Sequence, residues 1–239
     1  MKYIYSDNLT SFDNMMLDSY LFHKTTDDYL RVYKWKKPTI SLGVKNDLSL
    51  LNLEYIKKRN IDLVYRETGG GVIFHNEDLC FTIIASKNIA PKENYNFVKK
   101  IFEQILFELN LNVTTTNSTN INSDICFLGS NQHEISVDNK KVIGIAQKIK
   151  NKRFLVQGSI QLKTISIKKL FNTKQDIVQF GLTNINFNLL KTKIYNLFDT
   201  IFQLEIIAVE NILKSNIFNE FKEKECNRNV IEGIKWIKN

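Results

Sequence analysis

The chain has 239 residues, enough to bury a substantial core as one large domain. With 43% hydrophobic and 24% charged residues it has the composition of a soluble globular protein, and no apolar run approaches the roughly 20 residues of a membrane helix. The first residues lack the basic, apolar and small-residue segments of a signal peptide, so we expect a cytoplasmic protein. Three dispersed cysteines without a CxxC pair indicate free thiols and argue against a zinc site.

The net charge of +8 is compatible with an acidic partner, either a carrier protein or a nucleic acid. The abundance of lysine, asparagine and isoleucine, which a biased genome composition would also give, explains the charge equally well. No arginine-rich patch or aromatic-basic motif marks a nucleic-acid site. We therefore predict neither a nucleic-acid nor a membrane partner.

Hydrophobic spacing predicts the secondary structure in chain order. The expected elements are a helix at 11–24, strands near 29–35 and 39–42, a short helix near 49–59, strands at 61–66, 72–74 and 79–84, a helix at 94–110, three strands between 134 and 163, and helices in the final third. Polar breaks at 138–140 and 150–152 are typical of turns in a β-meander. Strands in the middle with helices at both ends indicate an α+β fold, and the lack of a linker favours a single domain over residues 1–239.

Three consecutive glycines, Gly69, Gly70 and Gly71, stand out because the chain has only nine glycines. They join two strand-like runs, 61–66 and 72–74, whereas a P-loop or dinucleotide fingerprint needs glycines that open a helix. Phosphate-loop readings are therefore excluded. Two alternatives remain: a tight hairpin turn, or a surface where backbone comes close to a ligand.

Cys126 and Lys141 are the residues with the clearest potential for chemistry. Cys126 lies in the polar stretch 123–130, where a thiol could reach solvent and act as a nucleophile if an ammonium group stabilised its thiolate. Lys141 begins a strand whose alternate positions include the small residues Gly144 and Ala146. Taken singly, each has a simpler explanation, since lone cysteines are usually inert and lysines beside turns are usually solvated.

Four segments resemble the biotin/lipoate protein ligase family. Residues 66–75 are similar to its signature of a basic residue, a Ser or Thr, glycines, a small hydrophobic pair and a His; residues 33–43 are similar to its aromatic-Pro-Ser-Leu-Gly segment. Residues 140–147 resemble its lysine motif, and 157–160 the strand that follows. The resemblance implies that family's fold, a mixed, mostly antiparallel sheet flanked by helices, with a motif core over about 10–205 and a helical tail over about 206–239.

The resemblance also implies a site. Octanoyl transferases of this family place a nucleophilic cysteine before the lysine, which makes Cys126 and Lys141 the expected catalytic pair. The expected substrate-binding residues are Arg66, Thr68, Gly69, Gly70, Gly71, Val72, His75, Gly144, Ala146, Gly158 and Ser159. No metal and no cofactor are implied.

The expected reaction moves an octanoyl group from acyl carrier protein, through a Cys126 thioester, to the lysine of a lipoyl carrier domain such as glycine-cleavage H protein. The acyl chain would lie between the glycines and the strand near Gly144 and Ala146, where burial of about 0.8 kcal/mol per methylene selects its length. Lys141 would hold the thioester carbonyl oxygen.

Some positions depart from the family pattern, and four alternatives stay open. Asn76 stands where an acid is common, Gln157 where a His is common, and 128–129 replaces a polar pair. The alternatives are an ATP-dependent lipoate ligase, with ATP and Mg as cofactors; an amidotransferase between carrier domains; a non-catalytic carrier-binding module; and a hydrolase using Cys126 and His133.

Overall fold

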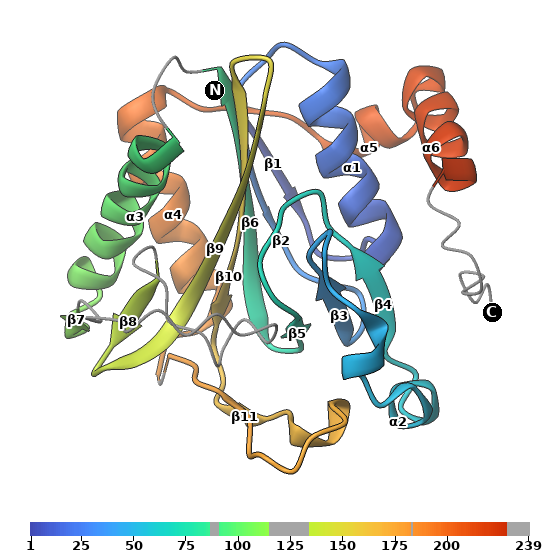
Figure 1. Ribbon diagram of the computed structural model, residues 1–239. Coiled ribbons are helices and arrows are strands. Elements are labelled where there is room, and N and C mark those ends of the chain that lie inside the picture. The colour runs from blue at the N-terminus through green and yellow to red at the C-terminus, as the bar shows by residue number, and fades with distance from the viewer. Residues whose placement is uncertain (87–90, 115–133, 183, 229–239) are drawn as a thin grey trace.

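A computed structural model describes residues 1–86, 91–114, 134–182 and 184–228, with side chains to 225. It shows the predicted α+β fold, with a central sheet in the order β13-β1-β2-β6-β10-β9-β8-β7 (Figure 1). These strands are β1 (Lys2–Ser6), β2 (Tyr29–Tyr33), β6 (Asp78–Ser86), β7 (Val113–Thr114), β8 (Ile135–Val137), β9 (Lys140–Lys150), β10 (Arg153–Gln161) and β13 (Glu205–Ile206). Only β13-β1 and β1-β2 are parallel, so the sheet is mixed and mostly antiparallel, as predicted.

Helices cover both faces of this sheet (Figure 1). On one face lie α3 (Pro91–Glu108) and α4 (Phe187–Phe202); on the other lie α1 (Ser11–Lys24), α5 (Val209–Leu213) and α6 (Asn216–Arg228). The core of the first face includes Phe81 and Phe102, whose rings stack with centroids 4.0 Å apart. Alternate residues of β6 and β10 point to opposite faces, so each strand contributes to both cores.

Local sequence explains several boundaries. The Thr10 side chain accepts a hydrogen bond from the Asp13 amide (3.1 Å) at the start of α1, and Asn186 caps α4 through the Leu189 amide (2.9 Å). The predicted meander is confirmed, because β8, β9 and β10 are consecutive antiparallel neighbours. Its two turns, 138–139 and 151–152, have φ values of 50–62°, the left-handed region that two-residue hairpins require.

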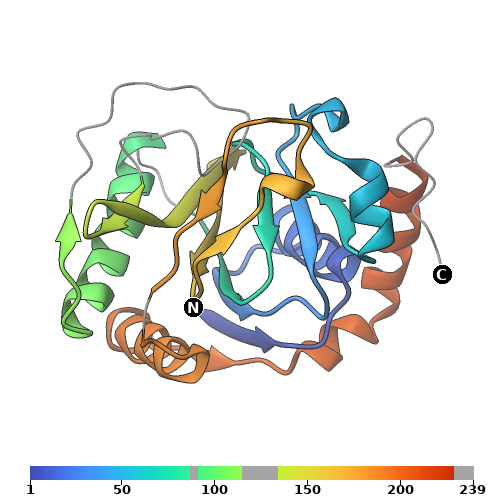
Figure 2. The same cartoon turned by 90° about the horizontal axis from the view of Figure 1, so that it is seen from below.

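A second, three-stranded sheet lies beside α1 (Figure 2). It consists of β4 (Asp62–Tyr65), β3 (Thr39–Leu42) and β5 (Ile73–His75), with β3 in the middle, parallel to β4 and antiparallel to β5. The glycine-containing segment therefore joins the two outer strands and crosses the end of β3. This topology excludes a hairpin between adjacent strands.

The remaining elements are short. The helix expected over 49–59 is split into a 3-10 turn, η1 (Leu48–Leu50), and α2 (Leu53–Lys58), because Asn52 caps a new helix through the Tyr55 amide at 3.1 Å. The other short elements are β11 (Ile165–Ser166), η2 (Lys168–Leu170) and β12 (Val178–Gln179). Within the described part of the chain, no helix combines the length and apolar character required to cross a bilayer.

Candidate functional site

The glycine turn, residues 66–72, is pressed against the end of β3. Gly70 has φ +87°, a conformation that favours glycine, and a Cβ atom at Gly43 would lie only 2.2 Å from the Gly70 carbonyl oxygen. Gly43 ends the predicted aromatic-Pro-Ser-Leu-Gly segment, so two sequence blocks meet here. Sequence reasoning gave Gly43 no role, because its contact with the turn is purely tertiary.

Arg66 is folded back into its own turn. Its Nη2 donates to the carbonyl oxygens of Gly69 and Gly71, both at 2.7 Å, and its Nη1 donates to the Ser41 carbonyl oxygen at 3.1 Å. The guanidinium group is buried. These bonds fix the backbone of the turn, and direct substrate binding by Arg66 stays a prediction.

Glu67 ties the glycine turn to α1 and β9. Its Oε1 accepts from Ser19 Oγ (2.7 Å) and lies 3.2 Å from His23 Nε2, while Oε2 pairs with Lys148. Burial raises the pKa of Glu67, but the hydrogen bonds from His23, Lys148 and Ser19 together outweigh burial and lower the pKa to about 2. The turn is therefore cross-linked to both neighbours by an ionised carboxylate.

This carboxylate predicts acid sensitivity. The pKa of Glu67 in the folded chain, about 2, is below its ordinary value of 4.5, so its contribution is fully present above pH 4.5 and is lost as the pH falls toward 2. We expect the free energy of unfolding to fall by about 1–3 kcal/mol more across this window in the wild type than in Glu67→Gln. Urea denaturation at a series of pH values measures the difference; equal pH slopes in the two proteins would contradict the assignment.

Thr68 and Val72, the residues that flank the three glycines, point into the protein. The Thr68 side chain is fully buried, and its Oγ1 donates to Gln157 Oε1 on β10 at 2.8 Å. Val72 packs with Ile40 and Leu42 in the core beneath the small sheet. Both residues shape the turn from inside, and their predicted contact with substrate stays a prediction.

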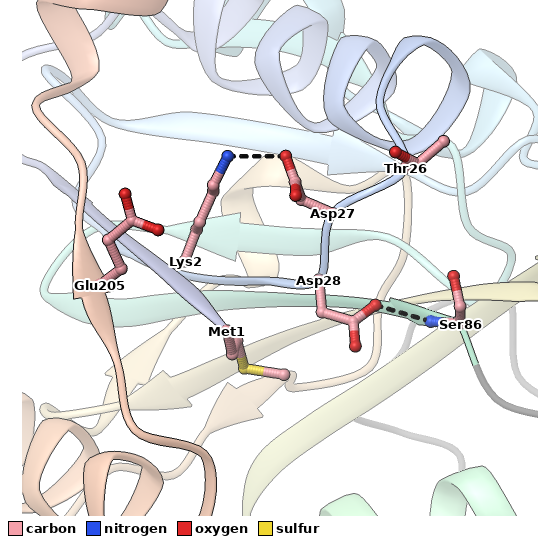
Figure 3. A pocket seen from close by; sticks show the side chains of 7 residues that line it. All are labelled: Met1, Lys2, Thr26, Asp27, Asp28, Ser86 and Glu205. Atoms are coloured by element: carbon pink, nitrogen blue, oxygen red, sulfur yellow. Dashed lines mark hydrogen bonds and ion pairs between the residues drawn. The ribbon is translucent and has the colours of Figure 1, made fainter.

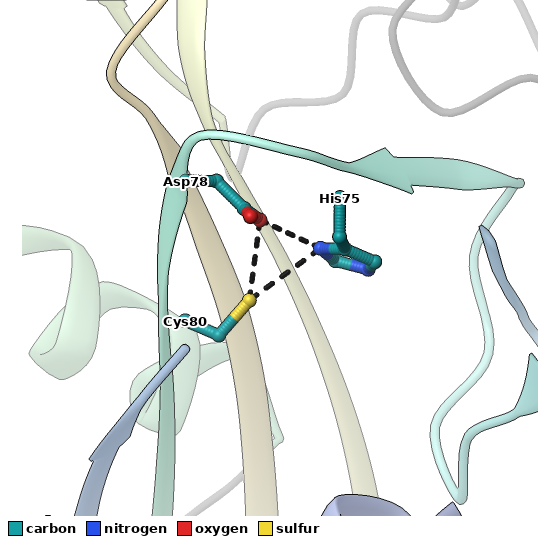
Figure 4. Close-up of side chains that lie close together, drawn as sticks. All are labelled: His75, Asp78 and Cys80. Atoms are coloured by element: carbon teal, nitrogen blue, oxygen red, sulfur yellow. Dashed lines mark hydrogen bonds and ion pairs between the residues drawn. The ribbon is translucent and has the colours of Figure 1, made fainter. Parts of the chain in front are cut away.

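His75 belongs to a buried hydrogen-bonded cluster where the small sheet meets the large one (Figure 4). Its Nδ1 lies 2.6 Å from Asp78 Oδ2, and that oxygen also accepts from Ser159 Oγ (2.6 Å) and from the Cys80 thiol (3.2 Å). The Trp35 Nε1–H donates to Cys80 Sγ at 3.1 Å. Sequence reasoning missed Asp78; its position three residues after His75 was the available signal.

The same cluster has the residue types of a metal site. Ligand atoms of His75, Asp78 and Cys80 lie within 4.8 Å of one another. Burial, followed by the charge of Asp78, raises the pKa of Cys80 well above its ordinary value, which keeps the thiol protonated. In the described structure Asp78 Oδ2 accepts hydrogen bonds from Ser159 and Cys80 and lies beside His75 Nδ1. That no metal takes part in function stays a prediction.

The cluster also contains a Ser–His–Asp series. Ser41 Oγ lies 2.8 Å from His75 Nε2, and His75 Nδ1 faces Asp78, the order found in hydrolytic triads. Ser41 is only 2% exposed, and its Oγ accepts from Arg66 Nη1 at 3.2 Å. A substrate cannot reach this hydroxyl, so the series stabilises the sheet junction.

The small residues of β9 face the glycine turn. Gly144 pairs with Ser159, and Ala146 with Gln157, so all four side-chain positions share one face of the sheet. A Cβ atom at Gly70 would lie 3.7 Å from the Ala146 Cβ, which places the turn directly over β9. The glycine turn and Ala146 therefore face each other, and the acyl chain expected beside them stays a prediction.

Gly158 packs against a core phenylalanine. A Cβ atom there would lie 2.1 Å from the Phe81 ring, which is buried on the α3 face of the sheet. The missing side chain makes room for core packing. The expected part of Gly158 in substrate binding stays a prediction.

Lys141 forms a buried ion pair. Its Nζ contacts Glu134 Oε1, and the two side chains are 9% and 7% exposed. Lys141 pairs with Ser136 across the β8–β9 hairpin, which brings Glu134 back alongside it. The expectation of a lysine beside a turn is confirmed, but the side chain is buried, and sequence reasoning missed Glu134 as its partner. Cys126 and His133 lie outside the described residues, and so does the predicted pairing of Cys126 with Lys141.

A separate depression of about 410 Å³ lies at the far end of β6 (Figure 3). Within it Lys2 Nζ donates to Asp27 at 2.7 Å, and Asp28 accepts from the Ser86 amide at 2.8 Å. None of the predicted site residues lines it. Lys2 and Asp27 form an ion pair there, and the depression lies away from the predicted site, so we do not place the reaction in it.

The chain is similar in sequence to one protein family and to curated octanoyltransferases. Residues 10–186 match the family described as the lipoyl protein ligase A/B catalytic domain. Octanoyltransferase LipM of Oceanobacillus iheyensis is 30% identical over 185 residues, 70% of this chain and 64% of that protein. The chain thus spans less than two thirds of the length of this curated relative.

Solved structures agree on the fold. A bipartite lipoate protein ligase from Thermoplasma acidophilum, studied with its E2 lipoyl domain, superposes with a TM-score of 0.74 at 13% identity, covering 93% of this chain and 90% of that one. Lipoate-protein ligase A bound with ATP gives 0.74 at 15% identity over 99% and 98%. At such identities the similarity establishes the fold alone.

Proposed function

The chain belongs to the lipoyl protein ligase A/B catalytic-domain family, and from this membership we propose that it is an octanoyltransferase of lipoate biosynthesis. The observation that carries the proposal is the position of Cys126, fifteen residues before Lys141, in a chain 30% identical to an octanoyltransferase. A ligase that activates a free acid with ATP has no need of a protein nucleophile.

In the first half of the proposed reaction the Cys126 thiolate attacks the carbonyl carbon of an octanoyl thioester. The new carbon–sulfur bond forms, the carrier's carbon–sulfur bond breaks, and the carrier thiolate leaves and takes up a proton. In the second half the neutral amine of a target lysine attacks the Cys126 thioester, forms an amide, gives up a proton and releases the thiolate. No cofactor is required.

The described residues support two parts of this scheme. Lys141 supplies an ammonium group from a buried ion pair, suited to hold the carbonyl oxygen as negative charge develops on it. The glycine turn over Ala146 supplies a surface without bulky side chains, suited to an aliphatic chain.

The proposed partners are two cytoplasmic carriers. Octanoyl acyl carrier protein would be the donor, and a lipoyl carrier domain, such as glycine-cleavage H protein, the acceptor. Support for the acceptor class comes from the archaeal structural neighbour, which was studied with its E2 lipoyl domain. The net charge of +8 is compatible with acidic carriers.

Intact-mass analysis of the protein mixed with octanoyl acyl carrier protein, without ATP, tests the function. We expect an octanoyl adduct on the wild type and none on Cys126→Ala. Cys226→Ala is the matched control and is expected to acquire the adduct at the wild-type rate. Absence of any adduct, together with ATP-dependent attachment of free octanoate or lipoate to a lipoyl domain, would show a ligase instead. An adduct from an octanoylated lipoyl domain but not from the acyl carrier would show an amidotransferase.

A further inference from the structure

A fully buried ion pair lies under the glycine turn. Arg31 of β2 and Asp18 of α1 both have 0% exposed side chains, and the guanidinium group contacts Asp18 Oδ1. Arg31 also donates to the Asn14 carbonyl oxygen at 3.1 Å and to Asn14 Oδ1 at 3.0 Å. Burial of a charge costs free energy unless the charge is paired and hydrogen-bonded. The further hydrogen bonds of Asp18 therefore show which groups this pair positions.

From Asp18 the hydrogen bonds lead in one direction to the turn. Asp18 Oδ2 accepts from Gln157 Nε2 at 2.7 Å, and Gln157 Oε1 accepts from Thr68 Oγ1 at 2.8 Å. An ionised carboxylate only accepts, so it fixes the amide of Gln157 with its nitrogen toward Asp18 and its oxygen toward Thr68. The charge of Asp18 thereby dictates which atom of Gln157 the turn meets.

We infer that Gln157 is a positioning residue, oriented by Asp18, that holds the glycine turn at a fixed height over β9. Gln157 pairs with Ala146 across the β10–β9 ladder, and the Ala146 Cβ faces Gly70. Gln157 thus lies beside Ala146 under the turn and also bonds to Thr68, the residue just before the glycines. The distance between the turn and β9 would then set the length of acyl chain that the enzyme accepts, an inference that rests on the proposed octanoyltransferase function.

The Thr68–Gln157 bond adds an anchor to β10 beside the contacts that Arg66 and Glu67 make. Three successive residues without side chains have the greatest backbone freedom of any sequence, and their turn joins the two outer strands of the small sheet. The Thr68–Gln157 bond joins the segment between β4 and β5 directly to β10. Its loss is expected to let the turn move away from Ala146 and widen the space between them.

Two threonines provide a matched test. Thr68 and Thr82 are both fully buried, and each donates one hydroxyl hydrogen bond of 2.8 Å into this network, but Thr82 bonds to Asp18 from β6 and is no part of the turn. We expect Thr68→Val and Gln157→Leu to speed amide hydrogen exchange of residues 66–72 about fivefold in the free protein, and Thr82→Val to leave it unchanged. Thr68→Ser, which keeps the hydroxyl, is expected to restore wild-type exchange.

The second readout is the ratio of adduct formation from octanoyl and dodecanoyl acyl carrier protein. We expect this ratio to fall at least about threefold in Thr68→Val and Gln157→Leu, and to be retained in Thr82→Val and Thr68→Ser. Equal exchange and equal ratios in Thr68→Val and Thr82→Val would overturn the inference. If the wild type forms no adduct at all, the proposed function fails, whereas the exchange experiment still decides whether Gln157 positions the turn.

Discussion

Replacement of Lys141 by methionine is expected to slow transfer of the octanoyl group to Cys126 by about 10²- to 10³-fold. Methionine keeps the length of the side chain but removes the ammonium group that would hold the thioester carbonyl oxygen and favour the thiolate. The measurement is the single-turnover rate of adduct formation at saturating octanoyl acyl carrier protein, followed by intact mass. A rate within about threefold of wild type would remove Lys141 from the mechanism.

The effect of Lys141→Met on the rate must be distinguished from its effect on stability through the buried partner, Glu134. Lys141→Met takes from Glu134 the ammonium group it pairs with, so the single variant is expected to unfold more easily. In Lys141→Met/Glu134→Gln the acidic charge is also removed, and we expect stability to return while the rate stays low. Lys140→Met, at an exposed neighbour on the same turn, is the matched control and is expected to keep both wild-type rate and stability.

The predictable parts of the fold are those whose structure is determined by residues close together in the sequence. The meander β8–β10 shows period-two alternation and Asp, Asn and Lys residues at the left-handed turn positions, so its strands and turns follow from a few neighbouring residues. By contrast β1, residues 2–6, was not predicted. Its partner strands are β2 and the distant β13, and its burial does not alternate strictly, so nothing in its own five residues identifies it.

The candidate site also has a part that local sequence patterns predict and a part that only tertiary contacts reveal. The glycine turn and its neighbour β9 could be located from glycine clustering and small residues at alternate positions. The contacts of Gly43 with Gly70, of Glu134 with Lys141 and of Asp78 with Ser159 could not, because each joins residues that only the tertiary fold brings together. The contact of Gly158 with Phe81 is of the same kind, since a glycine in a strand looks alike in the sequence whether it faces a pocket or a core phenylalanine.

Arg31 is the residue whose environment differs most from what its sequence suggests. In the strand Tyr29–Tyr33 an arginine would ordinarily face solvent, yet all five residues are buried. The α1 helix covers this face of the sheet and supplies Asp18 and Asn14, four residues apart and therefore on one side of the helix. A helix position and a strand position, neither informative alone, together make the buried ion pair possible.

Arg31→Met is accordingly expected to lower the free energy of unfolding by about 3–5 kcal/mol, since it leaves Asp18 buried without its guanidinium partner. Urea denaturation followed by circular dichroism measures the change, with Arg59→Met as an exposed control expected to stay within about 0.5 kcal/mol of wild type. Arg31→Met/Asp18→Asn, which removes both charges, is expected to regain part of the loss. A single variant as stable as the control would mean that the Arg31–Asp18 pair does not stabilise the fold, and it would remove the buried ion pair as the origin of the Gln157 orientation.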